Sequence, residues 1–86
     1  MSQATPLDVF VRSTIARACE LGRPDVAPDT PLLDLQIDSL RMVAIVSRVE
    51  QEFETRFSPD TILEFFMAEQ VEDLIGLMRD SIARSR

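Results

Sequence analysis

Asp38 and Ser39 are the residues best placed to do chemistry, because they stand where an acidic, proline-containing segment gives way to an amphipathic one. A serine in the first turn of a helix lies beside unpaired backbone N–H groups and at the positive end of the helix dipole. Both features would stabilise a phosphodiester on the hydroxyl oxygen of Ser39. Asp38 can cap the same turn, and before modification it could help a transferring enzyme hold its divalent metal. The alternative is that Asp38 or Ser39 is only an N-cap, since Asp-Ser is a common helix start.

The residue types that the chain lacks argue against catalysis by its own side chains. The 86 residues include no histidine, tryptophan or tyrosine, and there is one cysteine, Cys19. Ser39 and Cys19 are the candidate nucleophiles, and no histidine is present to activate either of them. A single cysteine can form neither an internal disulfide nor a CxxC zinc site, so we predict an inert Cys19 and no metal. We therefore expect that the chain is not an enzyme.

Composition and charge limit the class of partner. The chain is 45% hydrophobic and 28% charged, which is typical of a folded domain, and its length predicts one domain, 1–86, with a thin core. Its net charge of -6 disfavours a nucleic-acid backbone as partner and favours basic protein surfaces. We find no secretory signal and no apolar run near the roughly 20 residues of a membrane span. We expect a cytoplasmic monomer that binds neither nucleic acid nor a membrane.

The hydrophobic pattern predicts an all-α fold, a four-helix bundle with a long first loop and a short third helix. The predicted helices span about 6–21, 39–54, 59–67 and 70–84, and the loop spans 22–37. Thr5-Pro6 and Ser58-Pro59 are cap-plus-proline starts, and Gly22 is the predicted left-handed residue after the first helix. The start of the last helix carries a weaker signal. The loop leucines and isoleucine predict that this segment is held against the core: Leu32, Leu33, Leu35 and Ile37.

One face of the second predicted helix is apolar without belonging to the core. The core stripe of this helix consists of Met42, Ile45, Val46, Val49 and Phe53, at helical spacing. Leu40 and Val43 fall outside this stripe, on the side of Ser39. We interpret this apolar pair as a contact surface. The alternative is that the two side chains pack under the long loop.

The segment from Asp34 to Leu40, with the apolar spacing that follows it, resembles the acyl carrier protein family at its prosthetic-group site. The resemblance covers nearly the whole chain, since 29–32 is similar to the loop before that site and 71–75 to the start of the last helix. It implies that Ser39 carries 4′-phosphopantetheine, which comes from coenzyme A. It also implies that Asp38 is the acidic residue that precedes the attachment serine. The predicted partner-binding residues are Leu40, Arg41, Val43, Glu50 and Ile62.

Two features depart from this family's pattern. Gln36 stands where the family usually has glycine, and it would alter the turn or the fit of some transferases. The segment formed by the second helix and the residues just after it is nearly neutral, because three arginines, Arg41, Arg48 and Arg56, oppose three glutamates, Glu50, Glu52 and Glu54. Carriers of primary fatty-acid synthesis typically make this helix acidic, so the charge favours polyketide or nonribosomal peptide assembly. The alternative is that Arg41 is only a solvated side chain.

The third predicted helix is unusually apolar. Its five large side chains are Ile62, Leu63, Phe65, Phe66 and Met67. They either close a thin core, or some of them line a pocket or partner surface for a bound acyl chain.

The resemblance implies a free-standing carrier that holds acyl or aminoacyl groups as thioesters on the arm at Ser39. Its partners would be a phosphopantetheinyl transferase, an enzyme that loads the arm, and condensing or tailoring enzymes. A carrier for primary fatty-acid synthesis is the first alternative. An unmodified helical protein-interaction module, in which Ser39 stays bare, is an alternative of a different class. The sequence leaves the choice between acyl and aminoacyl cargo open.

Overall fold

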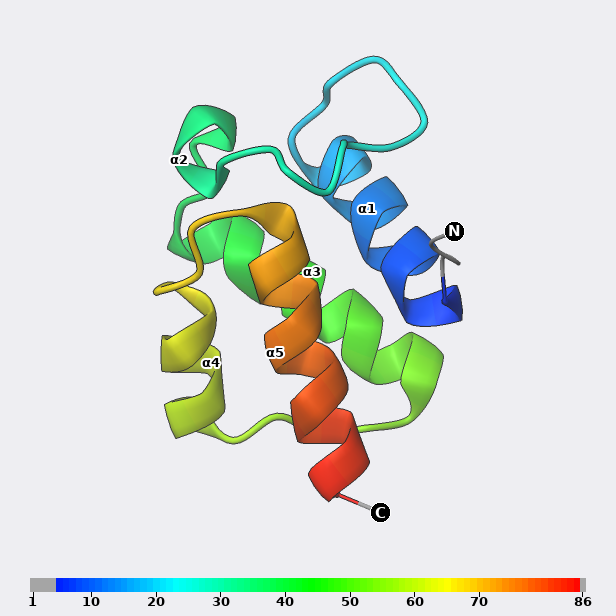
Figure 1. Cartoon of the computed structure of the whole chain (residues 1–86), viewed down its shortest axis with the longest axis vertical. Coiled ribbons are helices and arrows are strands. Elements are labelled where there is room, and N and C mark those ends of the chain that lie inside the picture. The colour runs from blue at the N-terminus through cyan, green and yellow to red at the C-terminus, as the bar shows by residue number, and fades with distance from the viewer. Residues whose placement is uncertain (1–4, 86) are drawn as a thin grey trace.

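The computed structural model describes residues 5–85, which form helices joined by loops, with no β-strand among them. The helices are α1 (Pro6–Ala18), α2 (Leu32–Leu35), α3 (Ser39–Phe53), α4 (Pro59–Phe65) and α5 (Val71–Arg84), shown in Figure 1. The predicted all-α class is confirmed. The four predicted helices correspond to α1, α3, α4 and α5, and α2 is an additional short helix inside the predicted loop.

The starts of α1 and α4 follow the predicted capping chemistry. Thr5 Oγ1 accepts a hydrogen bond from the N–H of Asp8 at 3.1 Å, and Ser58 Oγ accepts one from the N–H of Thr61 at 3.2 Å. In both helices a proline follows the cap, where its missing N–H costs nothing. The start of α5 is also capped, because Asp73 Oδ2 accepts from the N–H of Gln70 at 3.1 Å. This third cap was missed in the sequence.

The predicted ends of the helices need correction. Helix α1 ends at Ala18, not at residue 21, because Glu20 takes the left-handed conformation with φ of 52°. The N–H of Leu21 then donates to the carbonyl of Ala16 at 3.0 Å, and that of Glu20 to the carbonyl of Arg17 at 3.1 Å. This pattern is a Schellman motif. Gly22 is left-handed, as predicted, with φ of 74°. The prediction that Gly22 is the residue that ends the helix is wrong, because Glu20 takes that role.

Two further ends fall short of the predicted ranges. Helix α3 stops at Phe53, where Glu54 turns left-handed with φ of 50°, and α4 stops at Phe65. Helix α5 begins at Val71, one residue later than predicted.

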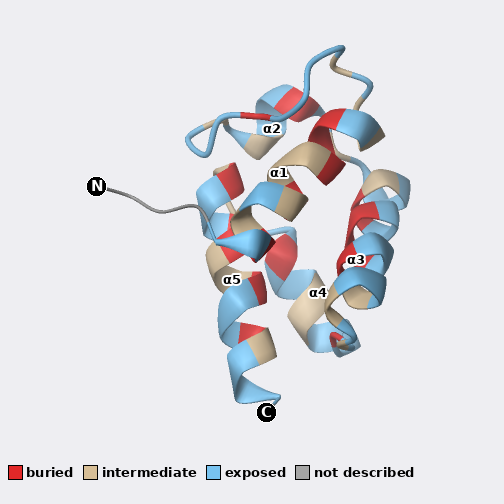
Figure 2. Cartoon of the chain, turned by 90° about the vertical axis from the view of Figure 1, so that its right-hand side faces the viewer, coloured by how far each residue is buried: buried red, intermediate tan, exposed pale blue. Residues whose placement is uncertain are grey.

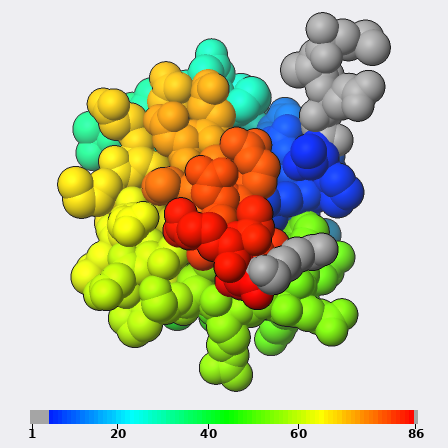
Figure 3. Space-filling view, turned by 60° about the horizontal axis from the view of Figure 1, so that its bottom comes forward, coloured from blue at the N-terminus to red at the C-terminus, as the bar shows by residue number. Residues whose placement is uncertain are grey.

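The core lies between α1, α3 and α5 (Figure 1). Helix α4 packs beside α5, and the two helices are neighbours on the face that Figure 3 shows. Figure 2 shows that the buried residues lie on the sides of the helices that face one another. The predicted stripe of α3 is buried, except for Phe53, which is partly buried and meets Phe10 edge to face at 5.7 Å between ring centres. Val26 in the long loop is also fully buried, which the sequence pattern did not indicate.

The long loop is fastened to both sides of the bundle. Arg12 Nε donates to the carbonyl of Val26 at 2.7 Å, which ties the loop to α1. At the other side, the N–H groups of Val71 and Glu72 donate to the carbonyls of Thr30 and Pro28 at 3.0 and 2.8 Å. The loop therefore satisfies amides at the start of α5 that a helix leaves unpaired.

The loop's apolar side chains are only partly held against the core. Leu35 is buried, and Leu32 and Ile37 are partly buried. Leu33 is 86% exposed, so the prediction that it packs on the core is wrong.

None of the helices in residues 5–85 is long and apolar enough to cross a bilayer. The predicted cytoplasmic location stays a prediction.

Candidate functional site

Asp38 is the N-cap of α3. Its backbone is extended, and Oδ1 of its side chain accepts a hydrogen bond from the N–H of Arg41 at 2.8 Å. The carbonyl of Asp38 accepts the first bond of the helix, from the N–H of Met42 at 2.9 Å. Asp38 therefore binds one of the backbone N–H groups that the start of a helix leaves unpaired. The alternative that one residue of the Asp38-Ser39 pair is an N-cap holds for Asp38.

Ser39 is the first residue of α3, and its side chain is exposed. Within residues 5–85 its hydroxyl makes no hydrogen bond, and no acceptor takes the backbone N–H of Ser39 or of Leu40. The hydroxyl therefore stands in solvent at the positive end of a 15-residue helix, beside two unpaired donors. This environment stabilises negative charge on a group attached there.

Leu40 and Val43 form an exposed apolar face next to Ser39. They are 81% and 54% exposed, so neither packs under the long loop. The structure contradicts the packing alternative for both residues. Large apolar side chains that are this exposed to water, beside an exposed hydroxyl, are available to a second protein.

A small groove lies on the other side of the start of α3. Its volume is about 250 Å³, and it is lined by residues of α2, α3 and the α4–α5 link: Leu32, Leu33, Gln36, Ile37, Met42, Phe66, Ala68 and Glu69. Gln36 and Ile37 come directly before the Asp38-Ser39 pair in the chain, so the groove lies near the start of α3, although neither Asp38 nor Ser39 lines it. Its lining is mostly apolar, with one carboxylate at Glu69.

Gln36 adopts the left-handed conformation. The sequence suggested this conformation, because the family that the chain resembles usually has glycine at this position. Its φ is 52°, and its N–H donates to the carbonyl of Leu33 at 3.2 Å as α2 ends. A residue with a Cβ pays a conformational cost there that glycine does not. The backbone nevertheless makes this turn, and the chain then continues through Ile37 to Asp38.

The other predicted partner-binding residues differ in their surroundings. Glu50 is partly buried, and its Oε2 accepts a hydrogen bond from the N–H of Phe57 at 2.9 Å, so it holds the α3–α4 link. Ile62 is partly buried against the core, and Phe65 beside it is fully buried. A role for Glu50 and Ile62 in partner binding stays a prediction.

Three side chains of α4 and the residues after it are more open than Ile62. Leu63, Phe66 and Met67 are exposed, whereas only Phe65 of the five apolar residues is fully buried. The thin-core interpretation therefore fits Phe65 and Ile62, and the partner-surface interpretation fits the other three. The sequence could not separate them, because α4 has too few turns to reveal which face is buried.

Cys19 and Arg41 are close enough to influence each other. Burial raises the pKa of the Cys19 thiol, the Arg41 guanidinium opposes this effect, and the Asp38 carboxylate adds to it. Cys19 follows the last residue of α1, so the end of α1 lies near the start of α3. A raised pKa keeps the thiol protonated, which agrees with the predicted inertness of Cys19.

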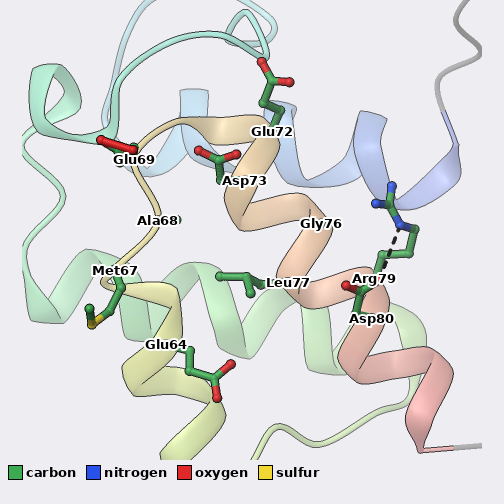
Figure 4. Close-up of a pocket in the computed structure, with 10 residues that line it drawn as sticks. All are labelled: Glu64, Met67, Ala68, Glu69, Glu72, Asp73, Gly76, Leu77, Arg79 and Asp80. Carbon is green, nitrogen blue, oxygen red and sulfur yellow. Dashed lines mark ion pairs between the residues drawn. The ribbon is translucent and has the colours of Figure 1, made fainter.

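A larger groove lies away from Ser39. It lies between α4 and α5 and holds about 750 Å³, with Leu77 pointing into it and carboxylates of both helices and their link around it (Figure 4). Those carboxylates are Glu64, Glu69, Glu72, Asp73 and Asp80. Residues 5–85 contain no group of three histidine, cysteine, aspartate or glutamate side chains that could hold a metal ion.

Comparison with known families gives one match. The family model described as a phosphopantetheine attachment site matches residues 9–78, which include Ser39 and all of α3. The same comparison with curated proteins and with solved structures finds no match.

Proposed function

This chain belongs to the family of phosphopantetheine attachment-site domains, and from that membership we propose that Ser39 is the residue that bears the arm. Domains of this family carry 4′-phosphopantetheine covalently and are not themselves catalytic. They interact with a phosphopantetheinyl transferase and with acyl-processing enzymes. The fold, all helices around a small core, agrees with this role.

The environment of Ser39 fits such an arm. Its hydroxyl is exposed and unbonded, and the unpaired N–H groups of Ser39 and Leu40 lie at the positive end of α3. A phosphodiester on Ser39 would be stabilised by these donors and by the helix dipole. The cap would stay intact, because it is made by Asp38. The exposed hydroxyl is the single observation on which the proposal most depends.

In the attachment reaction, Ser39 Oγ supplies the nucleophile and loses its proton to a base of the transferase. The new bond joins Oγ to the phosphorus that carries pantetheine in coenzyme A, and the adenosine bisphosphate leaves with the bridging oxygen. Asp38 keeps Ser39 at the helix start and offers a carboxylate oxygen beside a transferase-bound divalent metal. Once attached, the arm supplies a thiol that holds acyl or aminoacyl cargo as a thioester.

We further propose that the carrier serves polyketide or nonribosomal peptide assembly and not primary fatty-acid synthesis. Along α3 the side chains nearest Ser39 are apolar or basic: Leu40 and Val43 are exposed, and Arg41 follows directly. Glu50, one of the helix's acidic residues, is engaged by the Phe57 N–H. A partner with a purely basic docking patch would find little complementary charge here. The free-standing state of the carrier and the identity of its cargo stay predictions.

Intact mass measurement tests the attachment site. The purified protein is incubated with coenzyme A, Mg²⁺ and a transferase of broad specificity, and its mass is compared with that of Ser39→Ala. We expect the wild-type chain to gain one phosphopantetheine group and the variant to gain none. Ser47→Ala is the matched control, since Ser47 is an exposed serine further along α3, and it should load like the wild type.

Two results would count against the proposal. A wild-type chain that gains no mass would favour an unmodified interaction module, and a gain that persists in Ser39→Ala would move the site to another residue.

A further inference from the structure

Arginines line the contact between α1 and α3. A groove of about 390 Å³ lies there, lined by Thr14, Arg17 and Ala18 of α1 and by Ala44 and Arg48 of α3. Arg41 precedes Ala44 by three residues, so Arg41, Ala44 and Arg48 share one face of α3. We call this groove with Arg17, Arg41 and Arg48 the arginine seam.

Arg41 extends the seam toward Ser39. It lies two residues after Ser39, and its guanidinium acts on the Cys19 thiol at the end of α1. Its side chain is partly buried, whereas those of Arg17 and Arg48 are exposed. The seam therefore starts in the same first turn of α3 as Ser39. At about 100° per residue, Arg41 lies on the side of the helix away from the Ser39 side chain, and the seam follows that side along α3.

None of the three arginines of the seam has an ion-pair partner in residues 5–85. The ion pairs found there join Arg12 to Asp8 and Asp25, and Arg79 to Asp80. Arg23, Arg56 and Arg84 also have no ion pair there, so what distinguishes the seam is that three unpaired arginines lie along one contact between helices. Glu52 stands four residues after Arg48 and does not pair with it. The groove itself is lined by no carboxylate.

We propose that the arginine seam is the docking site for an acidic segment of an enzyme that acts on the arm at Ser39. Carboxylates of the segment would pair with the guanidiniums, which bind them in a bidentate manner. An apolar side chain of the segment would enter the groove, where the small residues Ala18 and Ala44 let it approach closely. This proposal rests on the proposed function, because the partner is defined by the arm.

The local charge of the seam and the net charge of the chain predict opposite signs for the charge of the segment that binds. The net charge of -6 would attract a basic segment and repel an acidic one. Within the groove of the seam the local charge has the opposite sign, because its lining includes two arginines and no carboxylate. An acidic segment would therefore bind in one orientation, since the rest of the surface disfavours it.

The test uses two synthetic peptides and the isotope-labelled Ser39→Ala protein. One peptide is an amphipathic helix of glutamate, leucine and alanine, and the other has lysine in place of glutamate. We expect the glutamate peptide to shift the backbone amide signals of Thr14, Ala18, Ala44 and Arg48. Its affinity should fall as salt is added, because exposed charges are screened.

Charge reversal locates the effect. Arg17→Glu and Arg48→Glu should each weaken binding of the glutamate peptide by about two- to fivefold, the range of exposed ion pairs. Arg79→Glu is the matched control, since it makes the same change of net charge at an exposed position on α5. It should leave the affinity within the error of the titration.

Three outcomes would overturn the proposal: no shift at millimolar glutamate peptide, a stronger effect of the lysine peptide on the same amides, or equal weakening by Arg79→Glu. Because the Ser39→Ala protein lacks the proposed attachment hydroxyl, these outcomes concern docking alone. A failure of the proposed function would show instead in the mass of the wild-type chain.

Discussion

Asp38 and Ser39 divide two tasks between them at the start of α3. The carboxylate of Asp38 binds the N–H of Arg41 and so satisfies the helix end, while the hydroxyl of Ser39 faces solvent without a partner. A helix start that used its serine as the cap would have to give up that bond on modification. Here the cap and the candidate attachment group are separate, and α3 can keep its first turn in both states.

Replacing Asp38 tests the capping role. Asp38→Ala should lower the free energy of unfolding by about 1 kcal/mol, the usual cost of losing an N-cap. Asp38→Asn keeps an oxygen acceptor and should lose much less. Urea denaturation followed by circular dichroism measures both. Equal losses in the two variants would contradict the capping role and would point to the charge of Asp38 alone.

The raised pKa of Cys19 predicts a pH dependence. Burial is its main cause, so the folded protein holds the thiol protonated at a pH where an exposed thiol begins to ionise. The protonated thiol contributes stability in full below the pKa of the unfolded chain, and this contribution is lost as pH rises through the higher folded pKa. We expect iodoacetamide to alkylate Cys19 more slowly in the folded protein than in urea at pH 8 to 9.

The variant Arg41→Gln provides a second test of the pKa of Cys19. The Arg41 guanidinium opposes the effect of burial, so its removal should raise the pKa of Cys19 further and slow alkylation again. A folded-state rate equal to that in urea, or a faster rate in Arg41→Gln, would show that the surroundings of Cys19 are described wrongly.

At the scale of the elements, α4 and the residues after it have one buried side and one exposed side. Phe65 is fully buried and meets Phe57 edge to face at 5.1 Å between ring centres, whereas its neighbour Phe66 is 43% exposed. Phe65→Ala should therefore lower the free energy of unfolding by about 3 to 5 kcal/mol. Phe66→Ala, the same change one residue later, should cost about 0.5 kcal/mol or less. Comparable losses measured by urea denaturation would contradict the orientation of α4.

The helices that the sequence predicted well are those with strong local signals. The pairs Thr5-Pro6 and Ser58-Pro59 fix two helix starts through chemistry that needs no tertiary contact. The apolar stripe of α3 spans about three turns, which is enough to define its buried face. The short α2 could not be predicted in this way, since four residues show no period. The early end of α1 depends on Glu20, a residue whose left-handed conformation no sequence signal announces.

The candidate site could be predicted only in part, because some of its features depend on contacts between distant parts of the chain. Ser39 and Asp38 were identified from their neighbours in the chain, and Gln36 was identified as a special turn position. Whether Leu40 and Val43 are covered depends on the path of the long loop, which hydrogen bonds to α1 and α5 determine. The arginine seam needs the packing of α1 on α3, which brings Arg17 to Arg48 across 31 residues of sequence.

For the molecule as a whole, charge is unevenly distributed. The groove between α4 and α5 has five carboxylates and one guanidinium, that of Arg79, in its lining (Figure 4). The arginine seam between α1 and α3 has none of the carboxylates in its groove. An approaching enzyme would therefore be oriented by the field of the carrier before any contact forms. This arrangement differs from a carrier whose attachment helix is acidic throughout.

Reversing Arg41 tests the consequence for partner choice. Arg41→Glu makes the start of α3 acidic, so enzymes of fatty-acid type, which favour an acidic attachment helix, should load the arm about two- to fivefold faster in kcat/KM. Arg79→Glu, which adds the same charge on α5, should leave that rate unchanged. Unaltered kinetics with Arg41→Glu would show that charge at this position does not select the partner.

The central claim is that Ser39 bears the arm, and its most direct test is the modification found on the protein in its own cells. Trypsin should release Ser39 within a peptide of residues 18–41, because cleavage after Arg23 is blocked by Pro24, and Thr30 is the other hydroxyl residue of that peptide. We predict that tandem mass spectrometry finds phosphopantetheine, with or without cargo, on Ser39. A bare Ser39 in protein from cells that make active transferase, or an arm on another residue, would contradict the claim.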